Sequence, residues 1–260
     1  MNTTQKVIKT FAICLAALII LSIINGVAHL VTSAFSFNND VNINETYNSD
    51  INNIKIDVGT TNMVIKYGDT FSITAENVSK EFKIKEEGNT LIIKEKNITI
   101  FGNKKSSHTT ITIPNDLNNL SIDIGAGKLE LSDITSNNFS LNQGAGKVVI
   151  TNLISNNTTI DGGAGELHIT SSKLQNLDLD LGAGKCYYNG ILLGNNKIDQ
   201  GVGELILDLY REDYTIKASK GLGSITINGE SYSKDVTVGE GINDIKIDGG
   251  IGSIIINTNK

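Results

Sequence analysis

The sequence is dominated by a short phrase that recurs at a nearly fixed interval. Its copies include SIDIGAGKLELS, SLNQGAGKVVIT and TIDGGAGELHIT, each a Gly-x-Gly step between two runs of alternating apolar residues. The first glycine stands at positions 125, 144, 163, 182, 201, 221 and 250, so the intervals are 19, 19, 19, 19, 20 and 29 residues. A fixed period of this length is typical of a chain that stacks one small structural unit on the next.

Each repeat has the pattern of two short strands joined at the Gly-x-Gly step. Apolar residues stand three positions before the first glycine and four and six after it, as Ile122, Leu129 and Leu131 do in the first copy. A spacing of two residues places side chains on one face of a strand, and no repeat shows helical spacing. We therefore predict an all-β fold, a single parallel β-helix or solenoid with coils of 19–20 residues.

The repeated glycines are predicted to be corners of the coils and not ligand loops. A tight corner needs positive φ and a close approach to the backbone of the next coil, which only glycine supplies at little cost. A phosphate-binding loop would lead into a helix, whereas every copy here leads into a strand. The predicted corner glycines are Gly125, Gly127, Gly144, Gly146, Gly163, Gly165, Gly182, Gly184, Gly201, Gly203, Gly221, Gly223, Gly250 and Gly252.

One continuous solenoid is predicted over residues 41–260. Residues 118–260 hold the regular coils, and residues 41–117 are interpreted as degenerate coils of the same plan, with Gly59 in the corner position. If the coils follow one another in sequence order, the C-terminal GSIIINTNK forms the last coil. Its edge would then have to dock on a partner or be blunted by its polar end.

Two local features of the upstream part complete this prediction. Residues 101–110 are expected to form an exposed loop. Pro114 is expected at the end of a strand, where its missing N–H costs least.

A charged column supports the same register. Three residues after the first glycine, Lys147, Glu166, Lys185 and Glu204 alternate in sign, so that stacked neighbours attract. A slip in register would remove this alternation.

A polar column two residues before the corner admits two interpretations. It contains Asp161, Asp180 and Asp199, and in other copies Asn142 and Ser219. Stacked carboxylates can hold Ca²⁺, whereas single Asp, Asn or Ser side chains can accept hydrogen bonds from the N–H groups of a turn. Because Asn and Ser suit the second role better, the turn role is favoured, and we predict neither a metal site nor a cofactor.

Composition and the remaining side chains argue against several functions. The net charge of −6 and a single arginine, Arg211, argue against a nucleic-acid partner. The histidines after the apolar run lack a nearby nucleophile, and the uniform acid column differs from an irregular catalytic cluster, so no catalytic residue and no enzyme is predicted. Tyr187, Tyr210 and Tyr214 are predicted to form an aromatic patch that serves either surface packing or binding.

The N-terminal part is predicted to anchor the protein in a membrane. Residues 11–31 contain no Asp, Glu, Lys or Arg, and a run of this length can span a bilayer as a helix. Lysines precede the run and none follows until Lys55, which predicts a cytoplasmic segment at residues 1–10, a linker at residues 32–40 and an exported C-terminal part. The alternative is a signal peptide that is cleaved near Ala34, releasing a secreted protein.

These features together resemble the putative-adhesin family of bacterial envelope proteins, a domain of unknown function. The resemblance lies in IKIDVGTTNMVIKYGD and NLSIDIGAGKLELSDI and extends over residues 41–260. It implies a β-solenoid at the cell surface and carries over no catalytic residue. The leading hypothesis is a membrane-anchored, non-enzymatic binding or structural protein whose partner is a cell-envelope component, either a wall polymer or a membrane protein.

Two other functions remain open at this point. One is an envelope-stress accessory protein that acts on a membrane sensor. The other is a β-helix enzyme that acts on polysaccharides. The sequence leaves the oligomeric state undetermined.

Overall fold

A computed structural model describes residues 41–47, 50–95 and 107–258, and within them the regular structure consists of strands alone. The all-β prediction is therefore confirmed. Thirteen strands join in one sheet, in which long segments pair in parallel. The predicted segments 1–10, 11–31 and 32–40 lie outside the described residues. No helix in the described part of the chain is long and apolar enough to cross a membrane.

The strands are β1 (Val41–Thr46), β2 (Asn53–Tyr67), β3 (Ser72–Val78), β4 (Phe82–Glu87), β5 (Thr90–Glu95), β6 (His108–Ile113), β7 (Leu117–Gln175), β8 (Leu177–Leu193), β9 (Asn195–Leu209), β10 (Tyr214–Ile227), β11 (Glu230–Tyr232), β12 (Val236–Val238) and β13 (Asn243–Thr258).

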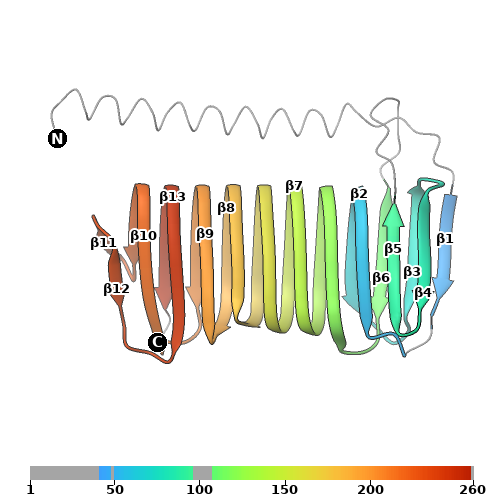
Figure 1. Ribbon diagram of the computed structural model, residues 1–260, viewed down its shortest axis with the longest axis horizontal. Coiled ribbons are helices and arrows are strands. Elements are labelled where there is room, and N and C mark those ends of the chain that lie inside the picture. The colour runs from blue at the N-terminus through green and yellow to red at the C-terminus, as the bar shows by residue number, and fades with distance from the viewer. Residues whose placement is uncertain (1–40, 48–49, 96–106, 259–260) are drawn as a thin grey trace, which may run out of the picture.

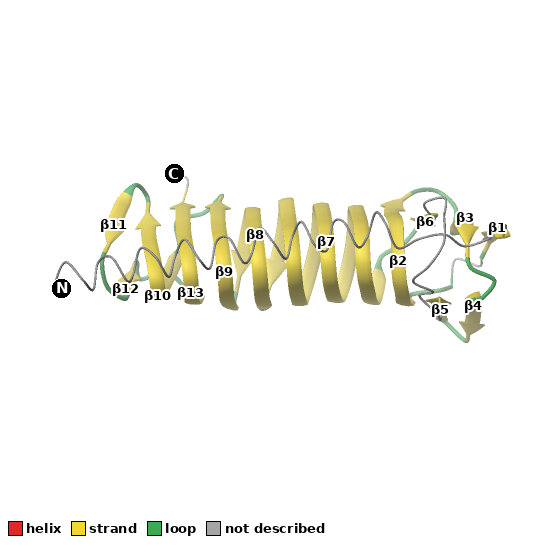
Figure 2. Cartoon of the chain, turned by 90° about the horizontal axis from the view of Figure 1, so that it is seen from above, coloured by secondary structure: helices red, strands yellow, loops and turns green. Residues whose placement is uncertain are grey.

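The middle of the chain winds into a stack of coils (Figures 1 and 2). β7 is 59 residues long because the strand continues through several coils without a break. Equivalent positions of successive coils lie side by side: Leu167 pairs with Cys186, and Cys186 pairs with Leu205. The step between partners is one repeat of 19 residues, so equivalent positions of the repeat form columns.

The apolar columns predicted from the repeat face the interior of the stack. Leu129, Leu131 and Ile122 are at most 1% exposed, and one apolar cluster extends from Ile51 to Ile256. Burial of apolar surface contributes roughly 25 cal/mol per Å², so this continuous core is the main stabilising element. Because each coil is too thin to bury its inner face alone, the coils are stable only when stacked.

The order of the coils departs from the sequence at the C-terminal end. β13 lies between β9 and β10: Ile255 pairs with Ile206 on one side and with Thr226 on the other. The prediction that GSIIINTNK forms the last coil is therefore wrong. β11 and β12 fold back antiparallel on β10 and occupy the outer side of that strand, so the place left for β13 is the slot between β9 and β10.

The N-terminal part follows the repeat plan only around β2. β2 pairs in parallel with β7, and β5 and β6 pair in parallel with the two halves of β2. β1, β3 and β4 are antiparallel to their neighbours, so the prediction of degenerate coils throughout residues 41–117 is wrong for these strands. The reason is local, since tight connections such as the Gly88 turn reverse the chain where a coil would continue it.

Two smaller predictions fall in the same part. Residues 108–110 of the predicted loop belong to β6, and Thr109 is buried, so the loop prediction is wrong for them. Residues 101–106 lie outside the described part. Pro114 directly follows β6, where no further ladder N–H is needed.

Candidate functional site

The Gly-x-Gly steps line up along one edge of the stack. A Cβ atom added to any of the fourteen predicted corner glycines would lie within 3.0 Å of a carbonyl oxygen of the neighbouring coil. The second glycine of several steps also has a positive φ, 121° at Gly146 and 146° at Gly165. Only glycine meets both conditions, so the coils are packed backbone to backbone along this edge.

The column of aspartates lies beside this edge on the outer surface. Asp161, Asp180 and Asp199 pair in sequence order, and Asp248 follows Asp199 because β13 is inserted there. Lys197 forms an ion pair with Asp199, and the Lys246 Nζ lies 2.7 Å from the Asp248 Oδ2.

Lysines and a hydroxyl group surround the carboxylates at one end of the column. Lys246, and then the Ser219 hydroxyl that donates to the Asp248 Oδ1 at 2.7 Å, hold the pKa of Asp248 below its usual value. The side-chain partners of Asp199 and Asp248 are thus lysines and a serine, and the turn role of the column stays a prediction. Within the described ranges, no three His, Cys, Asp or Glu side chains are arranged to hold a metal ion.

The three tyrosines of the predicted patch do not all lie on the surface of the stack. Tyr214 is only 1% exposed, and its hydroxyl accepts a hydrogen bond from the Leu192 N–H at 3.3 Å. Its inclusion in a surface patch is wrong because it takes an inward position of β10. Tyr187 and Tyr210 remain on the outer face, where Tyr210 is 47% exposed.

Tyr187 belongs to a longer column of outward-facing side chains, which we call the outer strip. The strip stands five residues after the first corner glycine, its members are half-buried, and they stack from coil to coil. The outer strip consists of Val149, His168, Tyr187, Ile206 and Ile255. The His168 and Tyr187 rings are 6.3 Å apart between centroids and tilted by 52°.

Charged side chains border the outer strip on the side of the corner. The Lys147 Nζ lies 2.9 Å from the Glu166 Oε2, and the Lys185 Nζ lies 2.6 Å from the Glu204 Oε2, so the predicted alternation produces ion pairs between coils. Lys147 holds the pKa of Glu166 below its usual value. The His168 Nε2 is 3.5 Å from the same carboxylate.

Neutral and acidic hydrogen-bonding groups border the opposite side of the strip. The Tyr210 hydroxyl donates to the Asn189 side-chain carbonyl, and a hydrogen bond to Asp208 raises the pKa of Tyr187. The Asn257 amide donates to the Asp208 carboxylate at 2.7 Å. The result is a flat surface that combines aromatic rings with a fixed array of polar groups.

An asparagine ladder on another part of the surface was missed by the sequence reasoning. Asn119 donates to Asn53 at 2.6 Å, Asn138 to Asn119 at 2.8 Å and Asn157 to Asn138 at 2.9 Å. Asn176 continues the ladder to Asn157 at 3.4 Å. The signal was present, because asparagines at positions 119, 138, 157 and 176 recur every 19 residues.

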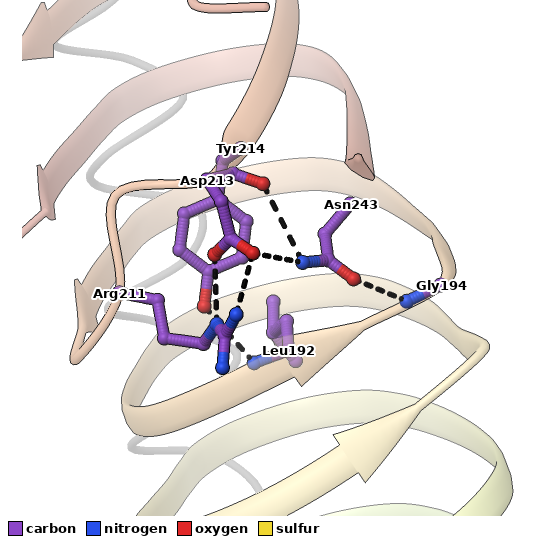
Figure 3. A network of polar contacts seen from close by, with 6 residues as sticks. All are labelled: Leu192, Gly194, Arg211, Asp213, Tyr214 and Asn243. Atoms are coloured by element: carbon purple, nitrogen blue, oxygen red, sulfur yellow. Dashed lines mark hydrogen bonds and ion pairs between the residues drawn. The ribbon is translucent and has the colours of Figure 1, made fainter. Parts of the chain in front are cut away.

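A second missed feature is a polar network where the chain crosses to β10 (Figure 3), which we call the clasp. The Arg211 guanidinium binds both carboxylate oxygens of Asp213, at 2.7 and 2.5 Å. The Asn243 amide donates to that carboxylate at 3.2 Å and accepts from the Gly194 N–H at 2.9 Å. Asp213, which the single arginine of the chain holds, and Gly194 thus tie the start of β13 to the preceding coils.

The family model described as Toastrack DUF4097 matches residues 51–247, which is most of the chain. The protein belongs to the Toastrack DUF4097 family. The match begins just before β2 and ends within β13, so it includes the regular coils and the clasp. The resemblance to a family of unknown function is confirmed by this match.

A solved structure with the fold of this Toastrack chain is that of a putative adhesin from Bacteroides fragilis, 16% identical, with a TM-score of 0.51, covering 83% of this chain and 97% of that one. A putative cell adhesion protein from Clostridium sporogenes is 17% identical, with a TM-score of 0.33 and coverages of 84% and 99%. A putative lipid binding protein from Parabacteroides distasonis is 16% identical, with a TM-score of 0.32 and coverages of 87% and 99%. No curated protein matches the chain.

Proposed function

We propose that the protein is a membrane-anchored, extracytoplasmic β-solenoid that binds a wall polymer through the outer strip. The observation that carries this proposal is the outer strip itself, a column of half-buried apolar and aromatic side chains that faces outward along a rigid stack. Large aromatic side chains that keep an exposed face and a polar end are enriched at binding surfaces. The family membership and the adhesin-named neighbour agree with a surface role.

A glycan fits the surroundings of the strip better than an anionic polymer does. Tyr187 and Tyr210 offer ring faces, and Asn189 and Asp208 lie beside them with oxygen atoms that accept hydrogen bonds. The lysines that border the strip are engaged by Glu166 and Glu204, so they offer little net positive charge to phosphate groups.

A binding role without catalysis agrees with the ion pairs and the ionisation of the acidic side chains near the strip. Cutting a glycosidic bond needs two carboxyl groups that face the same bond, one of them with a raised pKa. Glu166 instead has a lowered pKa and an ion pair with Lys147, and Glu204 is paired with Lys185. These partners support the proposal that the protein is not an enzyme.

The anchoring part of the proposal is supported by the uncharged run at residues 11–31. It is tested by the mass of the mature protein isolated from cells. An intact N-terminus in the membrane fraction supports the anchor, whereas a chain that begins just after Ala34 supports the secreted alternative.

The test of binding compares retention of the detergent-solubilised full-length protein on isolated cell walls and on membranes of the source organism. We expect saturable retention on walls and at least a tenfold weaker retention for the double variant Tyr187→Ala and Tyr210→Ala. The matched control is Ile154→Ala, since Ile154 is 43% exposed and lies outside the strip. Circular dichroism verifies that each variant is folded.

Each other outcome of this experiment contradicts a stated part of the proposal. Equal loss in the control variant would show that the strip is not the binding surface. Retention on membranes alone would overturn the wall-polymer proposal and favour the accessory protein that acts on a membrane sensor.

A further inference from the structure

The last strand of the chain occupies a slot that the rest of the chain leaves open. β13 pairs in parallel with β9 from Asp244 to Thr258 and with β10 from Asn243 to Ile256. Its inward residues Ile245, Ile247, Ile254 and Ile256 are at most 2% exposed. Without β13, the facing edges of β9 and β10 would both present unpaired backbone groups beside an open core.

The order of synthesis makes this slot a late site of assembly. β9, β10, β11 and β12 all precede β13 in the chain, and the segment from Tyr210 to Asp213 already bridges the slot. An equivalent strand from any copy of the protein has the sequence that the slot accepts. The pairing in parallel register is the same whichever copy supplies the strand.

A short linker of residues 239–242 connects β12 to β13 and passes tightly over the crossing chain. A Cβ atom on Gly241 would lie within 3.0 Å of the Asp213 and Tyr214 backbone, and Gly239 has a φ of 82°. Ile242 is 85% exposed although it is a large apolar residue. Short, constrained linkers of this kind favour exchange of the following element between copies, because opening the linker releases the constraint.

The clasp lies at the end of this linker. Asn243, the first residue of β13, bonds to Asp213 and to Gly194, which come from two different connections of the stack. In the exchanged arrangement the same contacts form with Asp213 and Gly194 of a second copy. All side-chain contacts of β13 are therefore retained, and only the linker changes its path.

We propose that β13 is an exchangeable strand and that a second copy of this chain is the partner of the slot between β9 and β10. Each copy donates β13 to the other, which gives a twofold dimer with two filled slots. The four linker residues extend over roughly 17 Å between the flanking residues, enough to reach a neighbouring copy beside the slot. The proposal does not depend on the ligand of the outer strip.

Disulfide formation between separate copies tests the exchange directly. Ile206 of β9 and Ile255 of β13 are partners in adjacent strands, so cysteines there are within the range of a disulfide. Full-length Ile206→Cys and full-length Ile255→Cys are co-expressed, each with Cys14→Ser, and separated on a non-reducing gel. We expect a linked product of twice the monomer mass, because only exchange places these two cysteines side by side.

The same experiment contains its controls. Val149 and His168 occupy the same strip within β7, whose coils do not exchange in the proposed dimer, so co-expressed Val149→Cys and His168→Cys chains are expected to stay unlinked. A single chain with both Ile206→Cys and Ile255→Cys reports whether the geometry closes a disulfide. Closure in that chain without any link between the co-expressed copies would overturn the proposal.

The linker gives a second, independent readout. Gly241→Ala clashes with the closed linker and is expected to raise the linked fraction several-fold. In the control Gly229→Ala the added Cβ meets nothing within 4 Å, and the residue lies outside the linker, so the variant is expected to leave the linked fraction unchanged. An unchanged fraction in Gly241→Ala, or an equal rise in both variants, would overturn the role assigned to the linker.

Discussion

At the scale of single residues, the second glycine of each corner is under the tightest steric constraint. Gly165 has a φ of 146°, and a Cβ atom there would overlap the Gly146 carbonyl group in the coil below. A side chain at this position would therefore suffer both an unfavourable φ and a steric overlap. This backbone conformation persists because the neighbouring coils on both sides hold it in place.

Gly165→Ala is accordingly expected to destabilise the protein by about 3 kcal/mol or more, since neither the φ value nor the neighbouring backbone can adapt. Gly88→Ala is the matched control. Gly88 has a φ of 61° with nothing within 4 Å, so only the conformational cost of about 1 kcal/mol applies. Urea unfolding of both variants measures the difference, and equal losses would contradict close packing at the corners.

Cys186 illustrates the chemical effect of burial in a column. Burial raises the pKa of its thiol to about 12 from the usual 9.0. The folded chain therefore holds the thiol protonated, and the stability from this group is complete below pH 9 and is lost as the pH rises from 9 to 12. We expect the Cys14→Ser protein to resist iodoacetamide at pH 8 when native and to react when denatured, as mass spectrometry can show. Rapid native labelling would contradict the buried position.

At the scale of elements, the sequence predicts which residues share a face but not which strand is the next neighbour. The columns through Leu129 and Leu131 could be found because period two and period 19 coincide in them. The position of β13 could not, since its apolar pattern fits beside any other coil equally well. What decides is that β11 and β12 take the outer side of β10. The Asn228-Gly229 turn marks the β10–β11 hairpin locally, whereas the pairing of β12 with β10 joins segments that are more distant in sequence.

The candidate site was predictable to a similar extent. Tyr187 and Tyr210 were found as aromatic residues on neighbouring coils. Tyr214 was misplaced, although it stands four residues before the inward position Ala218 and a period of two places it on the inner face. The outer strip was not recognised, since half-buried Val149 and Ile206 look like core residues in sequence. The clasp joins Arg211 to Asn243 through Asp213, and Asn243 belongs to the inserted strand, so the clasp depends on the same topology that the sequence left undetermined.

The asparagine ladder makes an element-scale prediction. Asn138 donates to Asn119 and accepts from Asn157, so Asn138→Ala breaks two bonds of the ladder. We expect a loss of about 0.5–1.5 kcal/mol in the free energy of unfolding. The loss is small because water can replace the removed hydrogen bonds of an exposed side-chain amide. Lys173→Ala, at an exposed position on a neighbouring segment, is expected to change stability by less than about 0.5 kcal/mol. Chemical unfolding measures both, and an unaffected Asn138→Ala would show that the ladder adds nothing.

At the scale of the whole molecule, stability depends on contacts between neighbouring coils and on how the two ends are closed. The C-terminal end is covered by β11 and β12, which pair antiparallel with the two halves of β10. The N-terminal end finishes in β1 and β4, each paired on one side within the described residues. The slot for β13 is a third edge inside the stack, closed only by the last strand.

Removal of residues 243–260 is therefore expected to loosen one end of the molecule and leave the rest folded. β10 would lose the strand that joins it to β9, while coils of β7 and β8 keep their neighbours. Hydrogen exchange of the truncated and complete chains should show lost protection in residues 214–227 and retained protection in residues 117–175. Such a gradient follows from a one-dimensional stack, in which the loss of one interface affects mainly the units next to it. Unchanged protection in β10 would mean that it docks directly on β9, so that β13 is dispensable for closing the stack.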